Sequence, residues 1–297
     1  MEGILIQFIQ HLINALNVGS IYALVALGYT MVYGIIKLIN FAHGDILMMG
    51  AYFGYIFALH FHLPLFACII LSMLVCAIFG ILIDKIAYLP LRKAPRLSPL
   101  ISALAVSILI QNIFRNIFGA NTKKMPDMID TAFSYNIGEL SISRLSIIII
   151  GVSLVCMFLL NILVKYTKIG RAMRSVSEDM QASELMGINV NRTISITFAL
   201  GSMLAAVGGI LFALAYNQIS PMMGTMPGLK AFVAAVIGGI GIIPGAVIGG
   251  FIIGIVETFT KAYISTSWAD AIVFLLLIIV FIFKPTGILG KNVKEKV

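Results

Sequence analysis

Nine apolar runs, separated by short polar connections, constrain this chain more than any other feature. A helix needs about 20 apolar residues to cross roughly 30 Å of hydrocarbon, and only 11% of the 297 residues are charged, against about 25% in soluble domains. The sequence therefore predicts one all-α domain over residues 1–297, a polytopic transmembrane helical bundle of about eight to ten spans, some short or broken. The runs lie near Leu12–Ile36, Ile46–Leu59, Leu65–Ala87, Leu97–Phe118, Leu145–Val164, Ile194–Tyr216, Leu229–Ile240, Ala246–Phe259 and Trp268–Phe283.

Basic residues concentrate in three of the polar connections, and this pattern predicts the orientation of the chain. Residues 84–98, residues 165–192 and the C-terminal tail hold 13 of the 20 lysines and arginines. Short loops rich in Lys and Arg stay in the cytoplasm, so these three connections are placed on the inner side. The net charge of +8 is spread over them without the dense basic patch of a nucleic-acid binder, so no nucleic-acid partner is expected.

A glycine-rich stretch near residue 240 decides how the last spans are counted. The connection Asn217–Gly228 is almost uncharged and is placed outside, so an odd number of crossings must separate it from the inner tail. Breaking the apolar segment 229–259 into two gives three crossings, and the break falls where glycine and proline gather. Interrupted segments of this kind point to transporter sites, which places four residues at the translocation pathway or its gate: Gly238, Gly239, Gly241 and Pro244. The alternative is plain helix packing through Gly249, Gly250 and Gly254.

A second polar interruption, residues 37–45, separates the first two apolar runs. Ionisable groups near membrane depth are costly and usually face a bundle interior or an aqueous path. One interpretation therefore puts Asn40, His43 and Asp45 beside the translocation route or at a gate. The other is a short cytoplasmic turn in which Asp45 caps the following helix.

The most polar part of the chain is the segment from Gly170 to Arg192, which lies between two apolar runs. It cannot sit in hydrocarbon, so it is predicted to be a helix at the inner water boundary. Met173, Val176 and Met180 form an apolar stripe at helical spacing, and Gly187 is placed to end the helix. Such a helix suits docking of a partner protein; a solvated connecting loop is the alternative.

The sequence offers little for enzymatic chemistry. It contains no phosphate-binding G-x-x-x-x-G-K-[ST] loop, and neither a nucleophile nor metal-ligand spacing accompanies His43. Cys68, Cys76 and Cys156 all lie inside apolar runs, as buried small hydrophobes do. We therefore expect no catalytic site, cofactor or metal in this chain, and any nucleotide-driven work would need another subunit.

Four motifs together resemble one known family. The chain is similar over its full length to the permeases of ABC importers for branched-chain amino acids, specifically the shorter, LivH-like type. The motifs are Ile39–Asp45 (INFAHGD) followed by residues 49–52, Gly170–Asn189, Val236–Gly250 (VIGGIGIIPGAVIGG) and Lys284–Gly290 (KPTGILG).

This resemblance implies a multi-pass protein of the bacterial inner membrane, surrounded by lipid. It implies a second, paralogous permease subunit or a second copy, two cytosolic ATPases that consume the ATP, and an extracytoplasmic substrate-binding protein. It also implies that residues 170–192 are the cytoplasmic coupling segment, with Ser175, Ser177 and Ser183 standing where the family often has alanine. The expected coupling residues are Arg171, Arg174, Glu178, Asp179, Glu184, Leu185, Met186 and Gly187.

Two other functions remain open at this point. An ion-coupled secondary transporter would accumulate solute from a gradient without companion subunits. A channel for a small neutral solute, such as urea or an amide, would let the solute flow down its own gradient without ATP or an ion gradient.

Overall fold

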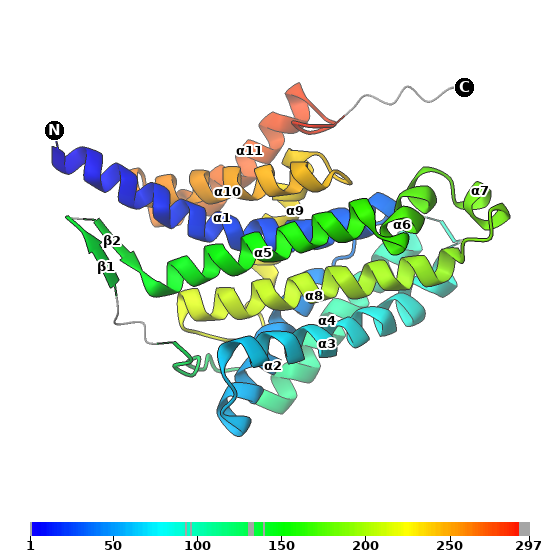
Figure 1. Ribbon diagram of the computed structural model, residues 1–297, viewed down its shortest axis with the longest axis horizontal. Coiled ribbons are helices and arrows are strands. Elements are labelled where there is room, and N and C mark those ends of the chain that lie inside the picture. The colour runs from blue at the N-terminus through cyan, green and yellow to red at the C-terminus, as the bar shows by residue number, and fades with distance from the viewer. Residues whose placement is uncertain (1, 93, 96, 130–133, 139, 291–297) are drawn as a thin grey trace.

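The computed structural model describes residues 2–92, 94–95, 97–129, 134–138 and 140–290, and these residues are almost entirely helical. Figure 1 shows the long helices lying side by side, with α6 and α7 at the right end of the bundle and the strands at the left. The helices are α1 (Glu2–Ile36), α2 (His43–Phe61), α3 (Leu65–Ile83), α4 (Leu97–Phe118), α5 (Arg144–Tyr166), α6 (Lys168–Glu178), α7 (Met180–Leu185), α8 (Val190–Tyr216), α9 (Thr225–Gly238), α10 (Ile243–Tyr263) and α11 (Ala269–Phe283).

The predicted transmembrane bundle is confirmed. Eight segments of the described residues are long and apolar enough to cross a membrane, and the shorter α9 supplies a ninth apolar helix. Each of the nine predicted runs corresponds to one helix, although α1 begins ten residues earlier than its run (Glu2 against Leu12). Extended structure in the described residues is limited to a small antiparallel hairpin, β1 (Ser134–Ile137) with β2 (Leu140–Ser143), in which Ser134 is opposite Ser143, and an isolated bridge between Lys123 and Ile219.

Two antiparallel helix pairs, α1 with α10 and α3 with α8, form much of the buried centre. Glycine allows the close approach: a Cβ on Gly254 would lie 2.4 Å from the Gly19 Cα, and a Cβ on Gly250 would lie 2.5 Å from the Ala23 Cα. On the other pair, a Cβ on Gly80 would lie 2.8 Å from the Phe198 carbonyl oxygen. The proposed packing role of the glycines in α10 is therefore correct, and it coexists with the break that precedes this helix.

The predicted break near residue 240 is present. Helix α9 ends at Gly238, and the chain turns through Gly239 (φ +108°) and Gly241 (φ +91°), a backbone region that favours glycine. Helix α10 then starts with Pro244 in its first turn, where the missing N–H costs nothing. The turn is covered by residues that follow α11, since the Ile288 N–H donates to the Ile237 carbonyl oxygen at 2.8 Å.

The chain is broken twice more, at the end of α1 and at the end of α8. Lys37 (φ +54°) and Asn217 (φ +49°) both adopt the left-handed conformation, and irregular segments then lead to α2 and α9. The starts of α2 and α9 meet, because a Cβ on Gly44 would lie 2.6 Å from the Gly224 carbonyl oxygen. Irregular backbone at membrane depth is tolerated when it is buried in protein in this way.

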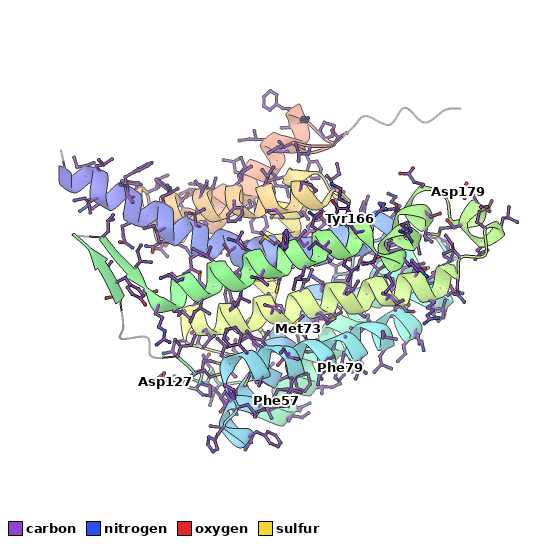
Figure 2. The ribbon with its side chains drawn as sticks, in the orientation of Figure 1. Phe57, Met73, Phe79, Asp127, Tyr166 and Asp179 are labelled. Atoms are coloured by element: carbon purple, nitrogen blue, oxygen red, sulfur yellow. The ribbon has the colours of Figure 1, made fainter. Side chains whose placement is uncertain are left out.

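The two ends of the bundle differ in character. Figure 2 shows Asp127, in the connection after α4, at one end of the long helices and Asp179, between α6 and α7, at the other. The described parts of the three basic connections gather at the Asp179 end: Arg92 contacts Asn191 there, and Arg174 lines the same cavity as Pro285. This arrangement matches the inner side that the basic residues predict. Large apolar side chains are exposed along α3, α4, α5 and α11, and such surfaces need lipid or protein to cover them.

Candidate functional site

The segment predicted as one helix at the inner boundary is two helices. Asp179 has an extended backbone (φ −151°, ψ 113°), and its Oδ1 accepts hydrogen bonds from the Gln181 and Ala182 N–H groups at 2.8 and 3.0 Å. A side-chain cap of this kind starts a new helix, so α6 ends at Glu178 and α7 begins at Met180. Gly187 (φ +81°) follows α7 and ends it as predicted.

The apolar stripe of this segment is shorter than predicted. Met173 and Val176 are buried against the bundle, whereas Met180 lies beyond the Asp179 break and is exposed. All eight residues expected to couple to an ATPase are exposed: Arg171, Arg174, Glu178, Asp179, Glu184, Leu185, Met186 and Gly187. Leu185 is 89% exposed and Met186 82%. Two adjacent, large apolar side chains at the tip of a polar elbow are unfavourable in water, and a partner would cover them.

Serines hold the two short helices together. The hydroxyls of Ser175 in α6 and Ser183 in α7 lie 2.9 Å apart, and the Ser183 hydroxyl also donates to the Asp179 carbonyl oxygen at 2.7 Å. Two of the three serines that depart from the alanine-rich pattern of the family therefore have a local structural role. The guanidinium of Arg174 donates to the Val164 carbonyl oxygen at the end of α5, which fixes α6 to its neighbour.

The predicted gate residues of the first break lie inside the bundle. The linker is exposed at Lys37 and becomes buried by Asn40, and His43 and Asp45 are buried as well. Asp45 accepts a hydrogen bond from the Gln111 side chain of α4 at 2.8 Å, and α2 begins without any side-chain cap. The alternative in which Asp45 caps α2 is therefore wrong: a carboxylate inside the bundle is satisfied by an amide from another helix instead.

His43 is fixed by α1. Its Nε2 lies 3.3 Å from the Val25 carbonyl oxygen, and its ring packs edge-on against Tyr29 with the centroids 4.4 Å apart. There is room for this ring because residue 28 is glycine, at which a Cβ would lie 2.4 Å from His43 Nε2. His43 therefore joins α2 to the middle of α1.

A cavity of about 850 Å³ opens at the inner end of the bundle. Its walls come from the α1–α2 linker (Lys37, Ile39), the α9–α10 turn (Gly241) and α6 (Arg174, Glu178). The two breaks and the inner polar segment, which are far apart in the sequence, thus border one space. Among the predicted gate residues only Gly241 belongs to this lining. The other six do not line the cavity: Asn40, His43, Asp45, Gly238, Gly239 and Pro244.

Sequence reasoning missed an ionic cluster between α9, α10 and α11. Glu257 Oε1 lies 3.0 Å from Lys230 Nζ and 2.5 Å from Lys261 Nζ, and its Oε2 accepts from the Tyr22 hydroxyl at 2.7 Å. Lys230 also pairs with Asp270 at 2.6 Å. The available signal was Lys230 itself, since a lysine inside an apolar run requires a nearby counter-charge.

Helices broken by glycine, close glycine-mediated crossings and a polar helical elbow at one end together define a multi-pass transport permease. The chain belongs to the family described as "Branched-chain amino acid transport system / permease component", whose profile matches residues 11–281.

Relatives in several bacteria are similar over their whole length. The permease protein BraD of the high-affinity branched-chain amino acid transport system of Pseudomonas aeruginosa is 41% identical, with 98% of each chain covered. The corresponding LivH protein of Escherichia coli K12 has the same identity and coverage. Among solved structures, PsaBC from Streptococcus pneumoniae in complex with Fab aligns with a TM-score of 0.50 and 14% identity over 92% of this chain and 91% of that one, which indicates a shared fold alone.

With the eight membrane-length helices, these comparisons identify the chain as a multi-pass permease of the bacterial inner membrane. They give no support to an ion-coupled secondary transporter or a channel.

Proposed function

We propose that this chain is the membrane-spanning subunit of an ATP-driven importer and that it translocates branched-chain amino acids. Full-length similarity to BraD and LivH supports this substrate class. The chain works beside a second, paralogous permease, with two cytosolic ATPases below and an extracytoplasmic binding protein that delivers the substrate. It carries no bond chemistry and no cofactor of its own, because the ATPases bind and hydrolyse the ATP.

The pair of exposed apolar side chains on α7 and its end carries this proposal. Leu185 and Met186 are the most exposed large apolar side chains of a largely polar segment at the inner end of the bundle. Seating them in an apolar groove of an ATPase removes both from water, and burial of such side chains is worth about 1.5–3 kcal/mol each. We assign the polar contacts at the rim of this interface to Arg171, Glu178 and Glu184, which are exposed on the same segment.

Movement of the docked segment reaches the transport path through the inner cavity. Arg174 and Glu178 form one wall of this cavity, and Lys37 with Gly241 lies on others. A shift of α6 relative to α1 and to the α9–α10 turn therefore changes the shape of the inner opening. The gate is formed around the two breaks, with Asn40, His43 and Asp45 on one side and Gly238, Gly239, Gly241 and Pro244 on the other.

Introducing negative charge at the tip of α7 tests the docking. In Leu185→Glu/Met186→Glu, we expect ATPase co-purification and ATP-driven uptake of leucine into proteoliposomes to fall at least about tenfold. Each loss of about 1.4 kcal/mol of binding free energy weakens binding tenfold, so losing the apolar contacts of these two side chains accounts for the expected effect. Membrane insertion remains normal, because both side chains are exposed.

The matched control is Met222→Glu, an exposed methionine outside the coupling segment, in the connection between α8 and α9. It leaves ATPase co-purification unchanged. Normal ATP-driven uptake by the double variant would remove the docking assignment, and gradient-driven accumulation by the chain alone would overturn the importer itself.

A further inference from the structure

The inner end of α3 does not continue as a regular α-helix. Residues Asp84–Tyr88 form a π-helical turn, η1, followed by a 3-10 turn, η2 (Leu89–Leu91). Short π-helical turns inside longer helices frequently occur at functional sites. Asp84 and Tyr88, the first and last residues of η1, both have fully buried side chains despite being polar.

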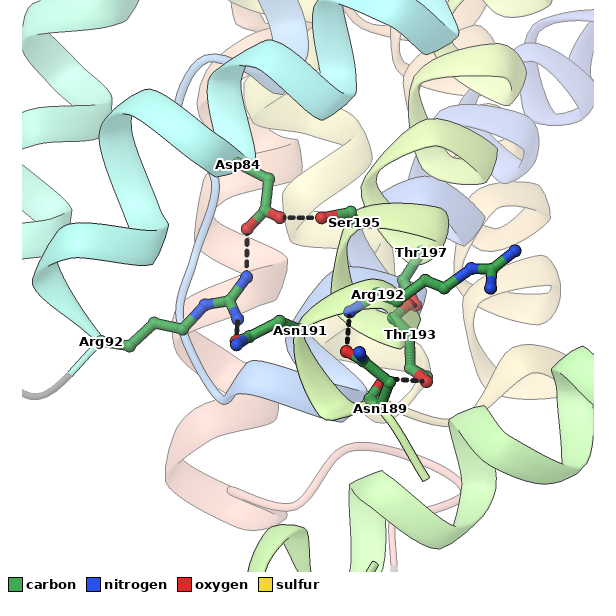
Figure 3. Close-up of polar contacts among 8 residues, drawn as sticks. All are labelled: Asp84, Arg92, Asn189, Asn191, Arg192, Thr193, Ser195 and Thr197. Carbon is green, nitrogen blue, oxygen red and sulfur yellow. Dashed lines mark hydrogen bonds and ion pairs between the residues drawn. The ribbon is translucent and has the colours of Figure 1, made fainter. Parts of the chain in front are cut away.

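Asp84 connects η1 to the start of α8. Its carboxylate pairs with Arg92 at 2.5 Å and accepts from the Ser195 hydroxyl at 2.6 Å, while Arg92 also donates to the Asn191 side-chain oxygen at 2.5 Å. Figure 3 shows these three contacts joining the end of α3 to the first turns of α8. Charged hydrogen bonds are the strong ones, so the two elements are held firmly together here.

The same turns of α8 emerge directly from the inner polar segment. Gly187 ends α7, and two residues later Asn189 caps α8 by accepting the Arg192 N–H at 2.9 Å. The Thr193 hydroxyl adds a second bond to the Asn189 carbonyl oxygen at 3.0 Å. A displacement of Leu185 and Met186 is thus transmitted to Asn191 through a short, capped piece of chain.

Tyr88 connects η1 to the α1–α2 linker. Its hydroxyl lies 3.2 Å from the Ile39 carbonyl oxygen and 3.2 Å from Asn40 Oδ1, and its ring packs against Phe198 of α8 with the centroids 5.0 Å apart. Asn40 Oδ1 also accepts the Ala42 N–H at 3.1 Å, which fixes the orientation of the amide. Tyr88 therefore donates to oxygen atoms of the linker that precedes His43 and Asp45.

Asn40 is buried, and its Nδ2 has no hydrogen-bond partner within the described residues. The buried amide is therefore held through its oxygen, by the Ala42 N–H and the Tyr88 hydroxyl. Besides the walls of the inner cavity, which α6 and the linker share, the hydrogen bonds of η1 offer a second connection between the inner polar segment and the linker.

We propose that Tyr88 is a positioning residue which, with Asp84 and Arg92, relays movement of the inner polar segment to the Asn40 linker. The relay runs from α7 through Asn191 and Arg92 to Asp84, across η1 to the Tyr88 hydroxyl, and from there to Asn40. It rests on the proposed function, because it assumes that an ATPase moves α7. The relay couples ATP hydrolysis to opening of the path, and it touches neither ATP nor substrate.

Tyr88→Phe tests the relay in the complete importer, reconstituted in proteoliposomes with its ATPases, partner permease and binding protein. The variant removes only the hydroxyl and keeps the ring packing on Phe198. We expect ATP hydrolysis to stay within about twofold of wild type, while leucine taken up per ATP hydrolysed falls at least about fivefold. Tyr263→Phe, an exposed tyrosine at the end of α10, is the matched control and leaves this ratio unchanged.

A double-variant cycle adds a second readout. If Tyr88 acts through Asn40, Asn40→Ala lowers the uptake-to-hydrolysis ratio too, and the double variant loses no more than the larger single effect. An unchanged ratio in Tyr88→Phe overturns the relay. So does an equal fall of hydrolysis and uptake, which is a structural effect, or a double variant in which the two losses multiply.

Failure of the relay is separable from failure of the proposed function. A wild-type complex that does not take up leucine with ATP refutes the proposed function whatever Tyr88 does. A wild-type complex that transports normally while Tyr88→Phe matches it refutes the relay alone.

Discussion

Two buried carboxylates, Asp84 and Glu257, occupy related places in the molecule but have different surroundings. Asp84 follows α3 and binds α8; Glu257 lies in α10 and binds Tyr22 of α1. Both helix pairs are antiparallel and closely packed through glycine. Asp84 forms an ion pair with Arg92, whose side chain is 16% exposed, and accepts a hydrogen bond from the neutral Ser195 hydroxyl. Glu257 is surrounded by two lysines, one of them almost completely buried.

The two clusters differ in how exposed their basic side chains are. The side chain of Arg92 is 16% exposed and is balanced by one carboxylate, with neutral hydrogen bonds to Ser195 and Asn191 completing the cluster. The side chain of Lys230 is only 7% exposed and is balanced by two carboxylates, the buried Glu257 and the half-exposed Asp270. The first cluster links η1 to α8, and the second is a clamp between α1, α9, α10 and α11.

The largest expected effect is that of Glu257→Gln. The amide keeps the shape of the side chain but removes the charge that balances Lys230 and Lys261. Breaking a buried ion pair from one side costs about 3–5 kcal/mol, and we expect a loss of this size in the thermal unfolding of the detergent-solubilised complex. Asp127→Asn, at an exposed pair with Lys124, is the control and costs about 0–1 kcal/mol. A loss below about 1 kcal/mol for Glu257→Gln would show that the cluster is not a clamp.

Asp84→Asn is expected to have an intermediate effect. The amide oxygen still accepts from Ser195 or Arg92, and the guanidinium of Arg92 turns toward water, so what is lost is one charged hydrogen bond, worth about 1.5–3 kcal/mol. The same unfolding measurement gives the value. If Asp84→Asn destabilised the protein as strongly as Glu257→Gln, the exposure of the basic partner would not explain the difference between the two clusters.

The smallest effect belongs to Asp270→Asn. Asp270 is half exposed and Lys230 keeps Glu257 as its partner, so the expected loss is at most about 1 kcal/mol, as for other exposed pairs. Unfolding of the Glu257→Gln/Asp270→Asn double variant then measures how far the two acids share Lys230. A single-variant loss close to that of Glu257→Gln would instead make Asp270 the main counter-charge.

Local chemistry in the sequence determined where the spans lie, which end faces the cytoplasm and where the chain breaks. Apolar runs of membrane length have only one low-energy environment, and Gly239 and Gly241 adopt a backbone conformation that other residues avoid. The exposure of the charged residues between 170 and 187 follows equally from their charge. The sequence also contained a local signal for the break at Asp179, since aspartate is a strong helix cap. The helical spacing of Met173, Val176 and Met180 instead suggested one continuous helix.

Tertiary structure alone decided which distant side chains meet. Asp84 meets Ser195 across 111 residues, Tyr22 meets Glu257 across 235, and Asp45 meets Gln111 across 66. Nothing in the local pattern selects these partners, because each polar residue could be satisfied by water, by its own backbone or by any neighbouring helix. The packing of the helices selects these partners. That packing depends on glycines that contact helices from the other half of the sequence.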